Sequence, residues 1–326
     1  MPARRSSHHF YGHHTDKGEH AVNQNLSVGT ATTRRKISLQ KQQNLIGWAF
    51  LLPAALLIVY FCFYPMLRAL LLSFQSGKGA KMSWCGVRNY AYLLKDNTFK
   101  QSLINNFIYL IIQVPVMLVL ALTLAVLLNN PKLKCRGIFR TAIFLPCATS
   151  LVSVSLIFRS MFSVDGFVNV ALMKLGVIDT GINWINGSAL TARAVIIIAL
   201  IWRWTGYNMV FYLSGLQNID SCIYEAARID GANSFQQFRK LTVPLLKPTI
   251  LLTAILSTNG TLQLFDESFN LTRGGPANMT LTMSHYIFKS SFETVPKFGY
   301  AAAMSYVIFL LVAILALVQL KVGDKR

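Results

Sequence analysis

The stretch INNFIYLIIQVPVMLVLALTLAVLL, from Ile104 to Leu128, contains no charged residue. As an α-helix it would be about 37 Å long at 1.5 Å per residue, which is more than the roughly 30 Å of a bilayer's hydrocarbon core. Helices inside soluble proteins seldom carry an uncharged apolar run of this length. The stretch therefore predicts a helix that crosses a membrane.

The composition of the whole chain agrees with this prediction. Of its 326 residues, 53% are hydrophobic and 13% are charged, and the mean hydropathy is +0.45, whereas about 25% of residues in soluble globular proteins are charged. A soluble enzyme is excluded on these grounds. The net charge of +19 would suggest a nucleic-acid partner in a soluble chain. Here the basic residues flank apolar runs, so we expect contact with membrane lipid and none with nucleic acid.

Further apolar runs predict an all-α, polytopic membrane protein with six transmembrane helices in a domain over residues 45–320. The fifth run is the weakest, because polar residues interrupt it. The expected spans lie at about 45–73, 104–128, 141–162, 194–216, 248–270 and 300–320.

Both ends of the chain are predicted to be cytoplasmic, because Lys and Arg are more frequent in the loops on the side of the N-terminus. Residues 1–44 predict a disordered, basic and His-rich tail, and residues 321–326 a short cytoplasmic tail. The histidine spacing fixes no helix face, so an unstructured tail is favoured over a metal site. The five cysteines fall in different segments, and we expect no metal site or disulfide.

The loop between the fourth and fifth spans, residues 217–247, predicts two short helices. Asp220 or Ser221 can cap the first helix, and Gly231 can adopt the left-handed conformation that ends it. Residues 233–236 match a capping box at the start of the second helix.

The first of these helices has small residues, Ala226 and Ala227, with Glu225, Arg228 and Asp230 around them. Small side chains allow close docking into a groove of another protein, and the surrounding charges can set the register. An ordinary solvated loop helix is the alternative that these residues leave open.

A resemblance to a known family favours the docking helix. Glu225-Ala226-Ala227, then Asp230-Gly231 and then Leu241-Thr242-Val243-Pro244 closely resemble the EAA loop of binding-protein-dependent ABC importer permeases. The resemblance covers roughly residues 45–321. Three further stretches are similar to the carbohydrate-uptake subgroup, namely Arg140–Pro146, Leu271–Pro276 and Phe298–Ala303.

This resemblance implies the type I ABC importer permease fold and a place in a bacterial cell (inner, cytoplasmic) membrane. It implies that the chain forms half of a translocation pathway for a carbohydrate, with a second permease subunit in a heterodimer, a pair of ATPase subunits and an extracellular or periplasmic solute-binding protein. By the same resemblance the residues that couple to the ATPase are Glu225, Ala226, Ala227, Arg228, Asp230 and Gly231.

Catalysis is not expected of this chain. No GxxxxGK[ST] phosphate loop is present, so ATP and Mg²⁺ are expected on the partner ATPase, and we expect no cofactor here. No arrangement of residues matches a catalytic motif.

Polar residues inside membrane spans predict the substrate path, because an unpaired polar group in lipid is costly. In these positions they can instead seal the interface between two permease subunits, and Trp202 and Trp204 also suit an interfacial belt. Alignment with the family by resemblance puts Gly206 and Gln263 near substrate contacts. The expected path residues are Gly206, Tyr207, Asn208, Asn259, Thr261, Gln263 and Asp266.

One other class of transporter remains open from the residues alone. Asp266 and Glu267 are carboxylates within the fifth span, and such groups can serve an ion-coupled secondary transporter. That class would need internal repeats, and the two halves of the chain show no convincing similarity.

Overall fold

The computed structural model describes residues 39–78 and 81–323. Most of the His-rich tail that the sequence predicts, and residues 324–326 of the C-terminal tail, lie outside this part of the chain. The chain divides into two compact units, one up to Leu57 and one from Ile58 onward. In the first unit the structure describes helix α1 (Leu39–Ile58), which ends one residue past the boundary. Residues 39–44, which we expected in the tail, are therefore helical.

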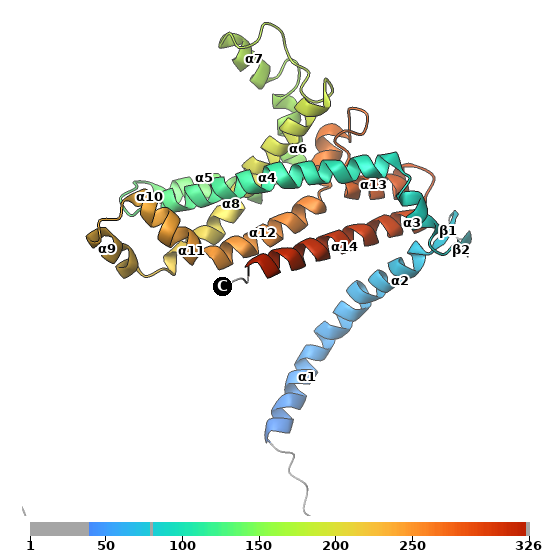
Figure 1. The fold of residues 1–326 in the computed structure, drawn as a ribbon. Coiled ribbons are helices and arrows are strands. Elements are labelled where there is room, and N and C mark those ends of the chain that lie inside the picture. The colour runs from blue at the N-terminus through green and yellow to red at the C-terminus, as the bar shows by residue number, and fades with distance from the viewer. Residues whose placement is uncertain (1–38, 79–80, 324–326) are drawn as a thin grey trace, which may run out of the picture. The chain divides into compact units, whose positions relative to one another are not determined.

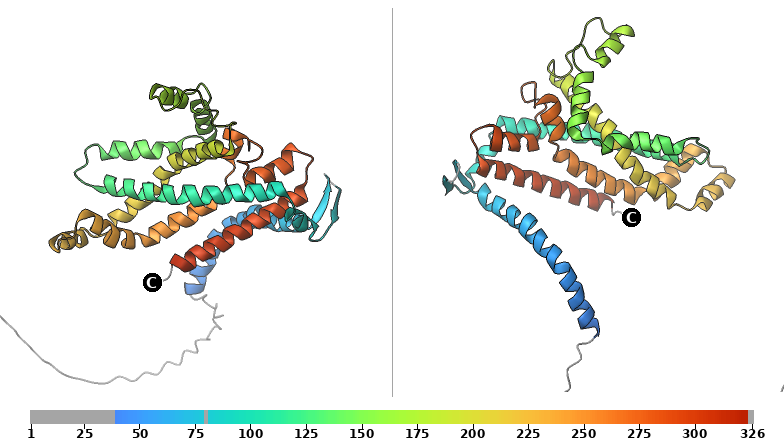
Figure 2. Two further views of the ribbon diagram at one scale, coloured as in Figure 1. Left: turned by 45° about the horizontal axis from the view of Figure 1, so that its top comes forward. Right: turned by 180° about the vertical axis from the view of Figure 1, so that it is seen from behind.

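The second unit begins with η1 (Val59–Phe63) and α2 (Tyr64–Ser73). Its centre is a bundle in which α4, α8, α12 and α14 lie side by side (Figures 1 and 2). These helices run over Asn97–Asn129, Ala189–Gln217, Lys247–Leu262 and Phe298–Gly323.

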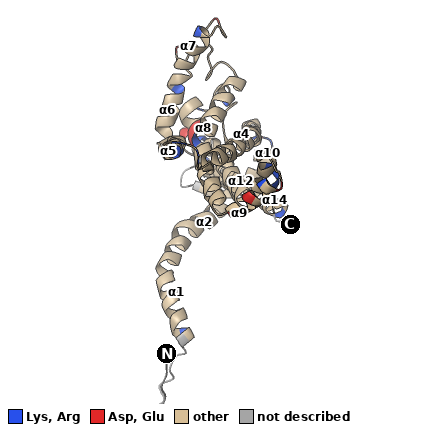
Figure 3. Cartoon of the chain, turned by 90° about the vertical axis from the view of Figure 1, so that its left-hand side faces the viewer, with Lys and Arg blue, Asp and Glu red and all other residues tan. Residues whose placement is uncertain are grey.

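Small residues bring the two longest helices of the bundle together. Ala121 and Ala125 on α4 are fully buried against Met209 and Tyr212 on α8. Without side-chain bulk the helices approach closely, and in lipid this packing takes the place of the hydrophobic effect. Figure 3 shows most of the bundle in tan, with charged residues near α9 and α10 and others near α5, α6, α7 and α8.

The third predicted span is not one helix. It divides into α5 (Arg136–Ala148) and α6 (Leu151–Met161), which meet at 98°, so the span expected at about 141–162 contains a sharp bend. Thr149 and Ser150 are extended at the break. Hydropathy averages over such a break, because the residues on both sides of it are apolar.

The fifth predicted span is also broken. It is preceded by α10 (Ser234–Gln237), η2 (Phe238–Thr242) and α11 (Val243–Leu245), and α12 ends at Leu262 instead of near residue 270. The chain then continues through residues 263–267 into η3 (Ser268–Thr272). Over the described ranges, four helices are long and apolar enough to cross a membrane, and six spans result if each bent pair is one span.

The remaining elements are short and lie between these helices. Strands β1 and β2 form an antiparallel hairpin in which Gln75 pairs with Trp84. The short elements are β1 (Gln75–Lys78), β2 (Lys81–Trp84), α3 (Arg88–Leu93), α7 (Phe167–Lys174), α9 (Ser221–Ile229), α13 (Met283–Phe288) and η4 (Lys289–Glu293).

Candidate functional site

A cavity of about 320 Å³ lies between α4, α8 and α12, level with Gln113 at the middle of α4. Both broken spans reach it, since Leu151 is the first residue of α6 and residues 263–267 follow the end of α12. The lining residues are Gln113, Leu151, Leu200, Trp204, Tyr207, Asn208, Leu256, Ser257, Gly260, Thr261, Gln263, Leu264, Phe265, Asp266 and Glu267.

Broken helices at membrane depth need partners for the carbonyls that the break sets free. Asn106 on α4 supplies them for α12, because its side-chain amide donates to the carbonyls of Thr261 at 3.2 Å and Leu262 at 2.8 Å. Its Oδ1 accepts from the backbone N–H of Met283 at 3.0 Å. One buried asparagine thus closes the end of α12 and anchors the start of α13.

Arg203 on α8 does the same for the break between α5 and α6. Its Nη1 donates to the carbonyls of Pro146 at 3.2 Å and Thr149 at 2.9 Å, and its Nη2 to the carbonyl of Cys147 at 3.3 Å. The guanidinium is buried, and a positive charge at a helix C-terminus is favoured by the helix dipole. Arg203 therefore fixes the corner from which α6 departs.

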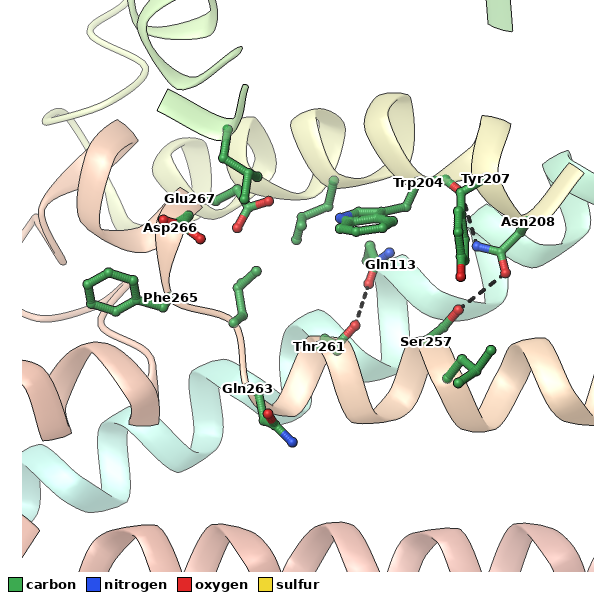
Figure 4. A pocket seen from close by; sticks show the side chains of 15 residues that line it. Gln113, Trp204, Tyr207, Asn208, Ser257, Thr261, Gln263, Phe265, Asp266 and Glu267 are labelled. Atoms are coloured by element: carbon green, nitrogen blue, oxygen red, sulfur yellow. Dashed lines mark hydrogen bonds between the residues drawn. The ribbon is translucent and has the colours of Figure 1, made fainter. Parts of the chain in front are cut away.

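Amide and hydroxyl groups from three helices form one wall of the cavity. Thr261 Oγ1 donates to Gln113 Oε1 at 3.0 Å, and Ser257 Oγ donates to Asn208 Oδ1 at 3.5 Å. Figure 4 shows Gln113 between Trp204 and Thr261. The wall thus presents neutral hydrogen-bonding groups and an indole ring.

Two adjacent carboxylates, Asp266 and Glu267, lie at the other end of the cavity from Tyr207 and Asn208 (Figure 4). Glu267 is 5% exposed. Phe265 lies beside them, so this end combines acidic and aromatic groups.

The predicted path residues divide between the cavity and its surroundings. Tyr207, Asn208, Thr261, Gln263 and Asp266 line the cavity. The Gln263 amide, however, points away from the other labelled side chains in Figure 4, and its Nε2 donates to Asn259 Oδ1 at 2.6 Å.

Gly206 and Asn259 are not among the lining residues. A Cβ at Gly206 would meet the backbone of Ile143 and Phe144 on α5. Glycine is therefore required for the close contact of α8 with α5.

Several lining residues are not among the predicted path residues, including Gln113, Trp204, Ser257 and Glu267. The sequence instead suggests an interfacial belt for Trp204 and ion coupling for Glu267. Gln113 was detectable, because it is a polar residue at the centre of an otherwise apolar span. Ser257 gave no such signal, since single serines are common in transmembrane helices.

The loop helix α9 has the predicted caps. Asp220 accepts from the backbone N–H of Cys222 at 3.0 Å, and Gly231 has φ +80°. Asn233 and Gln236 form the capping box of α10 in both directions. These three local predictions are confirmed.

Most of α9 is open to the surroundings. The coupling candidates on α9 and directly after it are exposed except Ala227, which is half-buried; they are Glu225, Ala226, Ala227, Arg228, Asp230 and Gly231. Ile229 is 87% exposed and Phe235 on α10 is 69% exposed. Tyr224 anchors the helix through a 3.0 Å hydrogen bond with Thr242 Oγ1. Large apolar side chains at the tip of a polar loop indicate a surface that contacts another chain.

A polar cluster outside the spans joins the start of α4 to α13. Burial raises the pKa of Asp96, but hydrogen bonds from Tyr286 at 2.6 Å, from Tyr300 and from the backbone of Thr98 and Phe99 outweigh it, so the net pKa is lowered. Asp96 is therefore a charged N-cap.

Burial has the opposite effect on the base in α13. It lowers the pKa of His285 to about 4, helped by the positive charges of Lys289 and Arg273. The neutral ring shares a 2.8 Å hydrogen bond between Nδ1 and Ser268 Oγ.

A bundle of apolar helices with broken spans around a polar cavity defines a transport permease, because irregular backbone at membrane depth is tolerated where it is buried or lines a water-filled path. The chain belongs to the family described as "binding-protein-dependent transport system inner membrane component", whose family model matches residues 90–324. It is therefore a multi-pass component of a binding-protein-dependent transport system.

Named relatives extend over most of the chain. The lactose transport system permease protein LacF of Rhizobium radiobacter is 51% identical over 298 residues, which cover 91% of this chain and 99% of that protein. The arabinooligosaccharides transport system permease protein AraP of Bacillus subtilis (strain 168) is 33% identical and covers 85% of this chain and 88% of its own.

A solved structure shares the fold. The crystal structure of a bacterial ABC transporter involved in the import of the acidic polysaccharide alginate matches with a TM-score of 0.78 at 21% identity, over 88% of this chain and 97% of that chain. The all-α permease fold that the sequence predicts is confirmed.

These findings confirm the resemblance to carbohydrate-type ABC permeases and the prediction of a transport subunit that is not an enzyme. The ion-coupled transporter based on Asp266 and Glu267 has no support from them. Among the described residues, no group of three or more metal-ligating side chains comes together.

Proposed function

We propose that this chain forms half of the translocation pathway of an ATP-driven importer for a sugar or related carbohydrate. The observation that carries the proposal is the cavity at the middle of α4, where two broken spans meet neutral polar and aromatic groups. The names of its relatives, which include permeases of lactose and arabinooligosaccharide systems, support a carbohydrate.

Within this proposal the sugar passes through the cavity. Tyr207, Asn208, Thr261 and Asp266 contact it. Gln263 lines the cavity with its amide bonded to Asn259, which is not a lining residue. Gly206 serves the path indirectly, since its contact with α5 sets the distance between α8 and α5.

The second part of the proposal is coupling through α9. Its exposed surface docks into a cleft of a separate ATPase, and Ala227 is half-buried; the exposed residues are Glu225, Ala226, Arg228, Asp230 and Gly231. ATP and Mg²⁺ are bound by that ATPase. Closure of the ATPase pair then moves the permease as a rigid body.

The remaining subunits and the topology follow from the family. A second permease completes the pathway as a heterodimer, and a solute-binding protein delivers the sugar from the extracellular or periplasmic side. The chain lies in the bacterial inner membrane with both termini in the cytoplasm, because the α9 loop must face the ATPase.

The test compares what copurifies with the wild type and with Gly231→Asp in mild detergent. Gly231 has φ +80° and open space around it, so Asp strains the turn and adds a charge without a clash inside the chain. We expect the variant to keep the second permease and to lose the ATPase. Glu225→Ala is expected to abolish uptake at normal expression.

Cys222→Ser is the matched control, because it changes an exposed residue of the same helix outside the motif. It is expected to retain both partners. If Gly231→Asp keeps the ATPase, the coupling role of α9 is refuted. If the wild type purifies alone and carries sugar in liposomes without ATP, the importer proposal itself fails.

A further inference from the structure

We infer that the cavity is built for a neutral, hydroxyl-rich sugar, and that Gln113 on α4 determines this specificity by donating its side-chain N–H to a sugar hydroxyl. The inference rests on the proposed function and adds the charge of the substrate and a residue outside the predicted path. It follows from the hydrogen bonds that the cavity wall makes without a ligand.

The side-chain N–H donor of Gln113 is bonded to a poor acceptor. Gln113 Nε2 donates to the thioether sulfur of Met117 at 3.1 Å, and a thioether is a weak acceptor. Asn208 Nδ2, which reaches the same sulfur at 3.6 Å, also donates to the carbonyl of Trp204 at 3.0 Å. Gln113, Met117 and Asn208 are buried, with at most 2% exposure. Gln113 lines the cavity, and its N–H would bind a hydroxyl oxygen there more strongly than it binds the sulfur.

The orientation of the Gln113 amide is fixed by its other end. Its Oε1 accepts from Thr261 Oγ1 at 3.0 Å, so the N–H side is held in place with the Met117 sulfur as its acceptor. The Asn208 Oδ1 accepts from Ser257 Oγ at 3.5 Å, which is at the limit of a hydrogen bond. This long contact leaves the Ser257 hydroxyl free to exchange toward a ligand.

The charges around the cavity exclude an acidic sugar. Asp266 and Glu267 are lining residues, and within the described part of the chain the lining contains no Lys, Arg or His. The guanidinium of Arg203 is near but is held by three backbone carbonyls of the α5–α6 corner. A ligand carboxylate would meet the carboxylate of Asp266, and the described lining offers no compensating cation.

The aromatic groups suit the same ligand. Trp204 and Tyr207 line the cavity opposite the Thr261 side, with their rings in an edge-to-face pair at 5.7 Å. An indole face provides apolar surface for the C–H groups of a sugar ring, while the amides bind its hydroxyls.

The test measures direct binding to the assembled complex by saturation-transfer NMR, without the solute-binding protein. The probes are lactose and its oxidised acid, lactobionate, each at millimolar concentration. We expect signals from lactose and none from lactobionate. Gln113→Met, which is nearly isosteric and lacks the amide, should weaken lactose binding about five- to tenfold, the effect of one net hydrogen bond.

Two further variants separate this role from packing. Met117→Leu removes the sulfur and keeps the volume, so lactose binding should stay within about twofold of wild type. Gln113→Glu keeps the acceptor for Thr261 and loses the N–H donor. It should weaken lactose binding as much as Gln113→Met does. If the Met variant fails to assemble, the Glu variant alone tests the donor role of Gln113.

Equal binding of lactose and lactobionate, or wild-type binding by both Gln113 variants, would overturn the inference. Loss of binding in Met117→Leu equal to that in Gln113→Met would also overturn it, because packing alone would then explain the effect. These outcomes leave the importer intact, since ATP-dependent uptake of lactose in proteoliposomes tests it separately. A wild-type complex that neither binds nor takes up either probe refutes the proposed function together with the inference.

Discussion

Replacing Arg203 by Met should destabilise the corner between α5 and α6, because three backbone carbonyls lose their donor. The carbonyls belong to Pro146, Cys147 and Thr149, and the guanidinium is 6% exposed. Met fills a similar volume and carries no donor. The carbonyls at the break would then face an apolar side chain.

The size of this effect can be bounded from the three bonds. Hydrogen bonds to a charged group are worth about 1.5 kcal/mol each at the lower end, which gives about 4.5 kcal/mol. Interhelical bonds measured in a membrane protein average about 0.6 kcal/mol, which gives about 1.8 kcal/mol. We therefore expect a loss of about 2 to 4.5 kcal/mol. At roughly 2 °C per kcal/mol for a large domain, the lower bound corresponds to about 4 °C in Tm.

Thermal unfolding of the purified complex in detergent measures this loss. Arg159→Met is the matched control, because Arg159 lies on α6 and is exposed. It should change Tm by less than about 1 °C, as expected for an exposed substitution. A Tm for Arg203→Met equal to that of the control would refute the role of Arg203 in holding the break.

Three further predictions follow from the packing and the titrating groups. Gly206→Ala should cost about 1 to 3 kcal/mol in thermal unfolding, because its Cβ meets the α5 backbone, whereas Gly260→Ala, in a helix with open space, should be neutral or slightly stabilising. Asp96→Asn should lower Tm at pH 7. Folding lowers the pKa of Asp96, so the wild type should have its full excess of Tm over the variant above pH 3.8 and lose it as the pH falls through the pKa of the folded state. A difference in Tm that persists in stronger acid would contradict this. The pKa of His285 is also lowered, from 6.5 to about 4, so the unfolded chain binds the proton first. Wild-type stability should therefore decrease as the pH is lowered from 6.5 to about 4. His285→Gln should make the stability depend less on pH over this interval.

The sequence predicts the bundle and the local structure of the coupling loop, because both depend on short-range patterns. Apolar runs mark the helices, and the caps at Asp220, Gly231 and Asn233 are decided by residues within a few positions. Gly231, for example, has a φ of +80°, in the left-handed region that the sequence predicts for a glycine at the end of a helix.

The breaks in the third and fifth spans were not predictable by the same means. The carbonyls freed at Pro146 and Leu262 are bonded by Arg203 and Asn106, which lie on other helices and far away in sequence. A window along the chain contains no information about such partners. The sequence indicated these partners only by placing a charged residue, Arg203, and an asparagine, Asn106, in otherwise apolar helices.

The packing role of Gly206 was not predicted for a related reason. Alignment by resemblance puts it near substrate, and the structure adds a close contact with Ile143 of a neighbouring helix. A glycine in a transmembrane helix predicts close approach of some backbone, but the sequence does not say whether that backbone belongs to a ligand or to a helix.

Helices α8 and α12, which line the cavity, are also the two helices that flank the coupling loop, because α9 lies between them in the chain. Close to the loop these helices are joined: Tyr212 on α8 shares a 2.8 Å hydrogen bond with Thr253 on α12, and a Cβ at Gly215 would lie 2.7 Å from Leu246 Cδ2. A close-packed joint of this kind transmits displacement and does not absorb it. In the proposed coupling, a force that the ATPase applies at α9 would therefore reach both α8 and α12. The breaks at Pro146 and Leu262 are held by Arg203 and Asn106 from neighbouring helices, so the same movement would be passed on to the helices around the cavity.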